Sequence, residues 1–432
     1  MRPTSSWISA DLQHLWHPFT QFDEWAVEPK LVIERAEGVR LIDTDGRAYL
    51  DATSSLWCNL FGHRHPTLDA AIRAQLDRVA HTTLLGLAST PSIALAERLT
   101  ALTGLDRVFY SDSGSTAVEV ALKMAFQAQQ QRGQTQRTRF AALADAYHGD
   151  TLGSVSVGGI DLFHGVYRPL LFDAVRIPAP DRADPAVEAA LLARATELFR
   201  AEGHTIAAFV FEPLVQGAAG MRMHSAAYLR ALCDLARDAG ALLVADEVAT
   251  GFGRTGTLFA LEAAGVKPDL LCIAKGLTGG YLPLAATLTT EAVFDAFRGP
   301  YTHWKTLFHG HTYTGNALGC AAALATLDVF AEEQVLAGLP ARIGALATAL
   351  AALSHPAITE IRHLGMMAAV CLGPFPSDAR TGHRVALACR DEGVIVRCLG
   401  DAVVVMPALV MTPADLRTCV ETIGRAVTRV CG

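Results

Sequence analysis

The sequence predicts an α/β fold with a mainly parallel central sheet wrapped by helices. Short apolar runs of strand length alternate along the chain with alanine-rich stretches of helical length, which is typical of parallel sheets. After about residue 320 the pattern changes, because helical stretches are followed by several short strands. We therefore expect a large sheet-based domain and a smaller α+β domain.

The strands of the large sheet are expected at apolar runs separated by helical periodicity, which is clearest over residues 225–239. In sheets of this kind, ligands collect at the carboxyl ends of the strands. The expected strands are residues 107–110, 139–143, 207–211, 242–245 and 270–274.

Both ends of the chain are expected to contribute to the smaller domain. Residues 31–34 and 40–43 are expected strands joined by a turn at residues 45–46, and strands are also expected near residues 365–372 and 394–407. We predict residues 1–58 as the N-terminal part of the small domain, 59–318 as the large domain and 319–432 as the C-terminal part.

Composition and charge exclude several classes of protein. The 432 residues are 51% hydrophobic and 18% charged, which indicates a large core rather than disorder. A net charge of −7 without a long basic run argues against nucleic-acid binding. The nine scattered cysteines and the lack of an apolar run of membrane-spanning length favour a cytoplasmic protein that binds no membrane. Two pairs of histidines, at residues 63 and 65 and at residues 309 and 311, could suggest metal ligands. No acid or cysteine stands at ligand spacing from them, so we expect no metal site.

Two of the apolar runs end at or near side chains that can take part in catalysis. One ends at Asp246, and Lys275 closely follows another. Taken singly, a lysine there is usually a surface residue and an acid is usually a helix cap. Together they suit pyridoxal phosphate (PLP), because the lysine amine can form an imine with the cofactor aldehyde while the carboxylate keeps the pyridine nitrogen protonated. We predict PLP as the cofactor, with Lys275 and Asp246 as catalytic residues.

A turn of small residues, 111–119, follows a predicted strand and opens a helix. The free N–H groups and positive dipole end of such a helix bind phosphate, although an ordinary capped helix is the alternative. Thr116 and Glu119 fit a capping box. The polar, glutamine-rich residues 127–139 are expected to form an exposed loop.

Residues 251–256 match the dinucleotide-binding pattern G-x-G-x-x-G, which would suggest an oxidoreductase. The preceding strand ends several residues before the first glycine, so the tight strand–glycine–helix turn is missing. We interpret the segment as a flexible loop that places Arg254 near the site.

These motifs together resemble the class III PLP aminotransferases. The resemblance covers nearly the whole chain and is carried by residues 211–221, 243–248, 251–256 and Lys275. It implies PLP fold type I and a homodimer with active sites at the subunit interface. It also implies two small-molecule substrates, an amino donor and a keto acid acceptor.

A narrower resemblance links the chain to the branch of this family that acts in biotin biosynthesis. It rests on residues 14–21, 54–57, 112–115, 147–151 and 309–312, of which the W-H-P-F-T run is the most specific. It implies transamination of 8-amino-7-oxononanoate to 7,8-diaminononanoate. Another class III activity, on ornithine, 4-aminobutyrate or a diamine, and a PLP aminomutase remain alternatives.

The resemblance also implies roles for individual residues. Lys275 would bond the cofactor and move a proton, and Asp246 would pair with the pyridine nitrogen. Tyr147 would cover the ring as a further catalytic residue. Cofactor-binding roles fall on Gly114, Ser115, Tyr147, Asp246, Lys275, His311 and Thr312, with Thr312 reaching the neighbouring subunit. Substrate-binding roles fall on Phe19, Leu56, Trp57, Tyr147, Gly310 and Arg397.

The chain departs from the members of this branch that use S-adenosylmethionine. They carry aromatic residues where this chain has Phe19 (tyrosine there), Leu56 and Val404, and proline where it has His311. A sulfonium-adenosine donor gains from aromatic faces by stacking and cation–π contact. The donor therefore stays open between S-adenosylmethionine and lysine, with a slight preference for lysine.

Overall fold

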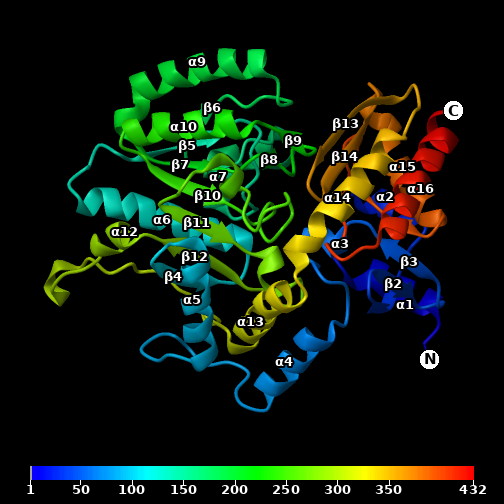
Figure 1. The fold of residues 1–432 in the computed structure, drawn as a ribbon, viewed down its shortest axis with the longest axis horizontal. Helices are drawn as coiled ribbons and strands as arrows, with labels where there is room; N and C mark the ends of the chain where they lie inside the picture. Colours follow the sequence, from blue (N-terminus) through cyan, green and yellow to red (C-terminus); the bar gives the residue numbers. More distant parts are fainter. Residues whose placement is uncertain (1) are drawn as a thin grey trace.

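The computed structural model describes residues 2–432 and confirms the α/β fold (Figure 1). Its central sheet has seven strands in the order β4-β12-β11-β10-β7-β5-β6, and β12 runs antiparallel to both of its neighbours. Because β10 and β11 are parallel neighbours, their carboxyl ends lie side by side, and so do Asp246 and the residues just after β11. The strands are β4 (Arg107–Ser111), β5 (Arg139–Leu143), β6 (Ala174–Ile177), β7 (Ile206–Phe211), β10 (Leu242–Asp246), β11 (Leu270–Ile273) and β12 (Ala285–Thr289).

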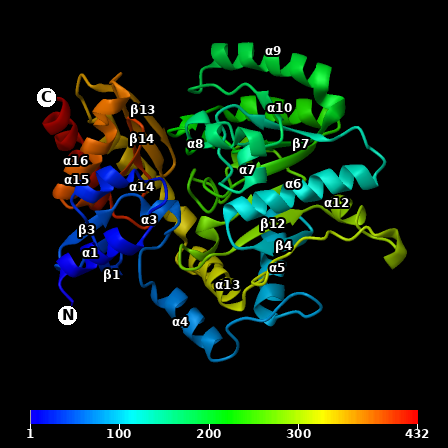
Figure 2. The ribbon, with the colours of Figure 1, turned by 180° about the vertical axis from the view of Figure 1, so that it is seen from behind.

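Helices cover both faces of this sheet. Helix α6 packs along β7, β10, β11 and β12 and lies in front of the sheet in Figure 2, while α10 packs on β7 and β10 and carries α9 outside it. Neighbouring elements are α4 (Pro66–Leu76), α5 (Thr90–Thr103), α6 (Gly114–Gln131), α7 (Leu152–Val157), α8 (Asp161–His164), α9 (Pro185–Glu202), α10 (Ala226–Asp238), α11 (Leu261–Ala264), α12 (Glu291–Asp295) and the short hairpin β8 (Val215–Gln216) and β9 (Arg222–Met223). Single 3₁₀ turns are η1 (Gly165–Leu170), η2 (Gly203–Thr205), η3 (Lys275–Thr278), η4 (Tyr301–His303) and η5 (Ser377–Ala379).

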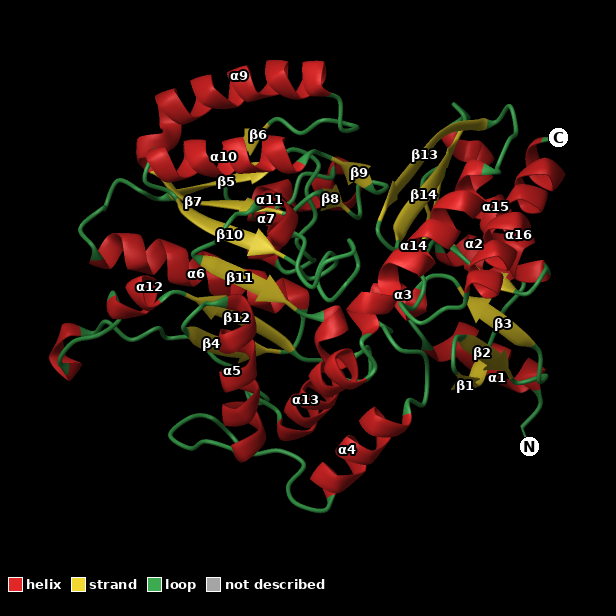
Figure 3. Cartoon of the chain, in the orientation of Figure 1, coloured by secondary structure: helices red, strands yellow, loops and turns green. Residues whose placement is uncertain are grey.

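Both ends of the chain meet in a smaller α+β unit, as expected (Figure 3). Strand β15 pairs in parallel with β3, so an N-terminal meander is completed by a C-terminal strand in the order β1-β2-β3-β15. A second sheet has the order β13-β14-β17-β16. The strands are β1 (Ile33–Glu37), β2 (Arg40–Asp43), β3 (Ala48–Asp51), β13 (Ile358–Leu364), β14 (Met367–Leu372), β15 (Val394–Ile395), β16 (Arg397–Leu399) and β17 (Ala402–Val405).

The remaining helices are α1 (Thr4–His14), α2 (Phe22–Val27), α3 (Ser54–Trp57), α13 (Ala317–Glu332), α14 (Val335–Ala351), α15 (Thr381–Asp391) and α16 (Pro413–Cys431). Helices α13 and α14 form a pair bent by 74° that connects the two units (Figure 1). Within residues 2–432, no single helix has the length and apolar character needed to cross a membrane, and only this bent pair satisfies both criteria when taken together.

The glutamine-rich segment was predicted wrongly as a loop over its whole length. Helix α6 continues to Gln131, and its glutamine amides bond to backbone carbonyls, so their polarity is used internally. The amide of Gln129, for example, donates to the carbonyls of Ala207 and Gly240 at 3.2 and 3.1 Å. The prediction therefore fails for residues 127–131, whereas residues 132–138 form turns and irregular backbone that is mostly exposed, as expected.

Two smaller expectations were also wrong. The capping box of α6 pairs Ser113 with Thr116, one turn earlier than expected, while Glu119 accepts hydrogen bonds from the backbone of α7. The turn at residues 45–46 joins β2 to β3, because β1 already returns into β2 at Gly38. The predicted domain boundaries stay a prediction.

Candidate active site

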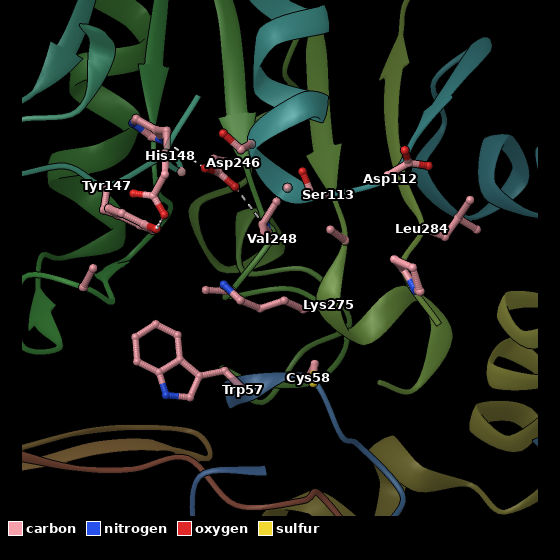
Figure 4. A pocket seen from close by; sticks show the side chains of 18 of the residues that line it. Trp57, Cys58, Asp112, Ser113, Tyr147, His148, Asp246, Val248, Lys275 and Leu284 are labelled. Atoms are coloured by element: carbon pink, nitrogen blue, oxygen red, sulfur yellow. Dashed lines mark hydrogen bonds and ion pairs between the residues drawn. The ribbon is translucent and has the colours of Figure 1, made fainter. Parts of the chain in front are cut away.

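A cavity of about 720 Å³ opens where β10 and β11 end (Figure 4). It lies at the carboxyl edge of the parallel strands, where the sequence placed the ligand site. Six of the predicted site residues line this cavity: Trp57, Gly114, Ser115, Tyr147, Asp246 and Lys275.

Lys275 begins the turn η3 and has a left-handed backbone, with φ of 38°. Figure 4 shows its side chain between Asp246 and Trp57, and its Nζ lies 5.3 Å from the centre of the Trp57 ring. Burial lowers the pKa of Lys275, although the carboxylates of Asp246 and Glu212 oppose this shift. The environment therefore favours the neutral amine, which is the form that acts as a nucleophile or base.

Asp246, at the end of β10, is held by two donors. Its Oδ2 lies 2.8 Å from His148 Nδ1, and its Oδ1 accepts the backbone N–H of Val248 at 3.0 Å. His148 Nε2 is buried without a partner among the described residues. His148 was missed in the sequence, where the only available indication was its place beside Tyr147.

The start of helix α6 lies in the cavity wall and suits an anion. Ser113 caps the helix, so the backbone N–H groups of Gly114 and Ser115 in the first turn have no carbonyl partner within the helix. Ser115 Oγ lies 2.7 Å from Thr151 Oγ1. A side chain at Gly114 would come within 2.5 Å of Val248, so glycine allows this close approach.

Tyr147 is fixed at both its backbone and its hydroxyl. Glu212 accepts its N–H at 3.1 Å, and the hydroxyl donates to Asp150 at 2.8 Å. Burial raises the pKa of Tyr147, so the hydroxyl stays protonated, and the positive charge of Arg397 opposes that shift. Burial also raises the pKa of Glu212 to about 7. Glu212 is a second cavity residue that the sequence analysis did not assign.

Comparison with known proteins decides the family. The model of the family "Aminotransferase class-III" matches residues 22–427. The chain belongs to the class III aminotransferases. It is accordingly an enzyme that depends on PLP, as the family and its PLP-bound relatives indicate.

Several relatives of this aminotransferase carry one name. The adenosylmethionine-8-amino-7-oxononanoate aminotransferase of Nitratidesulfovibrio vulgaris is 56% identical, over 98% of this chain and 81% of its own. The crystal structure of the enzyme of that name from Methanocaldococcus jannaschii superposes with a TM-score of 0.95 at 38% identity, covering 99% and 100% of the two chains. A PLP-bound amine transaminase from an uncultivated Pseudomonas species gives 0.90 at 36% identity, covering 96% and 99%.

Trp57 of this aminotransferase is presented by an uncommon turn. Ser54, Ser55, Leu56 and Trp57 all have left-handed φ, from 44° to 79°. Such a run persists in L-residues only where surrounding contacts impose it. The anchor is the buried Asp51, which accepts the Ser55 hydroxyl at 2.7 Å and so holds the indole against the Lys275 amine.

Arg254 lies behind this turn and does not line the cavity. It is fully buried, and its guanidinium donates to Ser54 Oγ at 2.8 Å and to the carbonyls of Asn59 and Pro407. Burial lowers its pKa to about 10. The glycine-rich loop thus supplies Arg254, whose hydrogen bonds connect the turn at residues 54–57 to Pro407 in the C-terminal part of the chain.

Six predicted site residues lie outside the main cavity of this chain. Leu56 is exposed, and Phe19 lines an adjoining cavity of about 450 Å³ that also includes Asp150. His311 Nδ1 lies 3.2 Å from Oδ2 of Asp112, which does line the main cavity. The other members of this group are Gly310, Thr312 and Arg397.

The residues of the cavity suit PLP. A helix start with free N–H groups suits the phosphate, the held carboxylate of Asp246 suits a protonated ring nitrogen, and Lys275 supplies an amine with a lowered pKa. Tyr147 offers an aromatic face. The phosphate, ring nitrogen, aldehyde and ring face of the cofactor therefore each have a matching group in the cavity.

Proposed function

We propose that the chain transfers an amino group to 8-amino-7-oxononanoate, giving 7,8-diaminononanoate for biotin synthesis. The observation that carries this proposal is the agreement of relatives that span almost the whole chain. The enzymes of that name from Nitratidesulfovibrio vulgaris and Anoxybacillus flavithermus are 56% and 46% identical over 98% of this chain. The cavity supports it, because an amine, a hydrogen-bonded carboxylate and a helix start with free N–H groups lie together there.

In this proposal five residues of the cavity have defined tasks. PLP, when bound, supplies an electron sink for the carbanion at the amine carbon. Lys275 Nζ takes the proton from that carbon, which requires its neutral form. Gly114 and Ser115 hold the phosphate, Asp246 keeps the ring nitrogen protonated, and Tyr147 covers the ring face.

The acceptor carries a carboxylate at the end of an apolar chain. We assign recognition of this carboxylate to Arg397 on β16, which is near enough to Tyr147 for its positive charge to oppose the rise in the pKa of the tyrosine. A guanidinium binds a carboxylate through two parallel hydrogen bonds, which fixes direction as well as charge. Phe19, Leu56, Trp57 and Gly310 form the rest of the substrate-binding set that we propose.

The amino donor is S-adenosylmethionine or lysine. The names of the relatives favour the former. The residues Phe19, Leu56, His311 and Val404 favour lysine, because they replace groups expected in S-adenosylmethionine-using members of the branch. We propose to decide between them by mixing the PLP-loaded enzyme with each donor and following the loss of cofactor absorbance.

We further propose a homodimer in the cytoplasm, with active sites at the subunit interface. His311 and Thr312 do not line their own chain's cavity, and the same loop exposes Phe308 by 68% and Tyr313 by 54%. A second subunit would cover these apolar side chains and bring Thr312 to the phosphate of the neighbouring site. The nine cysteines, all free, support the reducing location.

A second candidate is amine transfer to other ketones. An (S)-enantioselective omega-transaminase from Thermomicrobium roseum gives a TM-score of 0.94 at 32% identity, so the same scaffold carries that activity elsewhere. Turnover of simple ketones with no turnover of 8-amino-7-oxononanoate would favour this candidate.

The direct test supplies 8-amino-7-oxononanoate together with either donor and detects 7,8-diaminononanoate by mass spectrometry. Lys275→Ala is expected to lower turnover by about 10⁴-fold, because it removes the group that moves the proton. It is also expected to abolish labelling of this position by borohydride in the presence of PLP. Product formation by Lys275→Ala at the wild-type rate would contradict the assignment.

A further inference from the structure

The segment that carries Phe19 has no buried residue of its own. Residues 2–30 are exposed or half-buried throughout, and the neighbouring Trp16 is 87% exposed. Within one subunit, burial of apolar surface, which orders most of a folded chain, therefore contributes little here. Specific polar contacts have to offset the conformational entropy that is lost when this segment is ordered.

Phe19 nevertheless has a defined and strained conformation. Its φ of 52° is left-handed, which a non-glycine residue adopts when its surroundings impose it. The ring of Phe19 meets Phe163 edge to face at 5.4 Å, and Phe163 meets Tyr147 at 6.4 Å in the same manner. This series of rings connects the N-terminal segment to the wall of the main cavity.

Asp11, on helix α1, ties this segment down. Its Oδ1 lies 2.7 Å from Nε2 of His17, and its Oδ2 accepts a hydrogen bond from Nε1 of Trp25 at 2.9 Å. The His17 and Trp25 rings also touch, with centroids 4.5 Å apart. One carboxylate thus uses both oxygens to close the turn between α1 and α2, and Phe19 lies inside that turn.

We propose that Asp11 is a positioning residue for the acceptor. By holding His17, it fixes the backbone at Phe19 and so fixes an apolar wall that contacts Tyr147 through Phe163. This inference rests on the proposed function, in which the alkyl chain of the keto acid packs against Phe19. Without Asp11, ordering of the segment has to occur during binding, which weakens the affinity for the acceptor. Proton transfer at Lys275 is not affected.

The test compares Asp11→Ala with Asp23→Asn in the PLP-loaded enzyme. Asp23 is a matched control, because it is exposed on α2 and no side-chain hydrogen bond or ion pair of it occurs among residues 2–432. Asp11→Ala is expected to raise KM for 8-amino-7-oxononanoate about tenfold, with kcat changed by less than about twofold. Trp25→Phe, which loses the N–H but keeps a ring against His17, is expected to give a smaller rise.

A second measurement does not depend on turnover. Hydrogen exchange of residues 15–20, followed by mass spectrometry, is expected to become faster in Asp11→Ala and to stay unchanged in Asp23→Asn. An unchanged KM in an active Asp11→Ala variant, or unchanged exchange, would overturn the inference. Equal losses of kcat and bound PLP would also overturn it, because they indicate general damage. If wild-type enzyme does not turn over this acceptor, the proposed function fails instead, and the exchange measurement still tests the role of Asp11.

Discussion

His148 Nδ1 lies 2.8 Å from Asp246 Oδ2, and both side chains are excluded from solvent, with exposures of 0% and 5%. A buried carboxylate without hydrogen-bond partners is costly, so the contact with His148 stabilises the burial of Asp246. It also fixes the orientation of the carboxylate at the end of β10. His148, which also lines the cavity, is therefore expected to act on the cofactor through Asp246.

Replacement of His148 by alanine is expected to weaken PLP binding by about 10- to 100-fold, since a charge-assisted hydrogen bond is worth about 1.5–3 kcal/mol. Absorbance titration of the cofactor-free enzyme measures this directly. His148→Asn retains a donor and is expected to recover part of the affinity. His14→Ala, an exposed histidine on α1, serves as the control. Wild-type affinity in His148→Ala would show that Asp246 does not depend on this contact.

The sequence predicted the sheet and its two reactive strand ends because both depend on local patterns. Apolar runs mark the strands, and Asp246 and Lys275 come next to two of them. The parallel pairing of β10 and β11 then necessarily brings those ends together. Asp246, Lys275 and the helix start with Gly114 and Ser115 could therefore be selected from local patterns, whereas Trp57 and Tyr147 were selected through the resemblance to the family.

The missed features depend on contacts between distant segments. Nothing local marks His148 as the partner of Asp246, which is 98 residues away. The left-handed turn before Trp57 is imposed by Asp51 and Arg254 and has no glycine to indicate it. The glutamines of α6 looked like a loop because their partners, the carbonyls of other segments, are invisible in a linear sequence.

Glu247, beside Asp246, is expected to make the stability depend on pH. Burial raises its pKa to about 7 from 4.5. The unfolded chain loses this proton near pH 4.5 and the folded chain only near pH 7, so stability falls as the pH rises through that window. The loss is on the order of 3 kcal/mol.

Glu247→Gln does not ionise, so denaturant unfolding at pH 5 and pH 8 is expected to show a smaller fall in stability than in the wild type. Glu34→Gln, at an exposed position on β1, is expected to behave like the wild type. Equal pH dependence in Glu247→Gln and the wild type would mean that the carboxyl ionises as readily in the folded state.

Leu56 allows the strain of the left-handed turn to be measured. Its φ is 79°, and its side chain is 52% exposed, so little packing is lost on substitution. Leu56→Gly accepts this conformation freely, whereas Leu56→Ile adds a branch that opposes it. We expect Leu56→Gly to be more stable than Leu56→Ile by about 2 kcal/mol in urea unfolding. Equal stability would place the turn in another conformation in solution.

Arg397 is the residue whose substitution separates recognition of the acceptor from chemistry. A lysine at this position keeps the charge but loses the two parallel hydrogen bonds, so KM for 8-amino-7-oxononanoate is expected to rise about tenfold in Arg397→Lys and about a hundredfold in Arg397→Met. The donor half-reaction should be unchanged, and an acceptor without a carboxylate should show no difference between the variants. Arg384→Met, at an exposed arginine on α15, controls for loss of surface charge. If Arg397→Met kept a wild-type KM, the distant carboxylate would have to be bound by another cation, and the partner subunit would be the place to look for it.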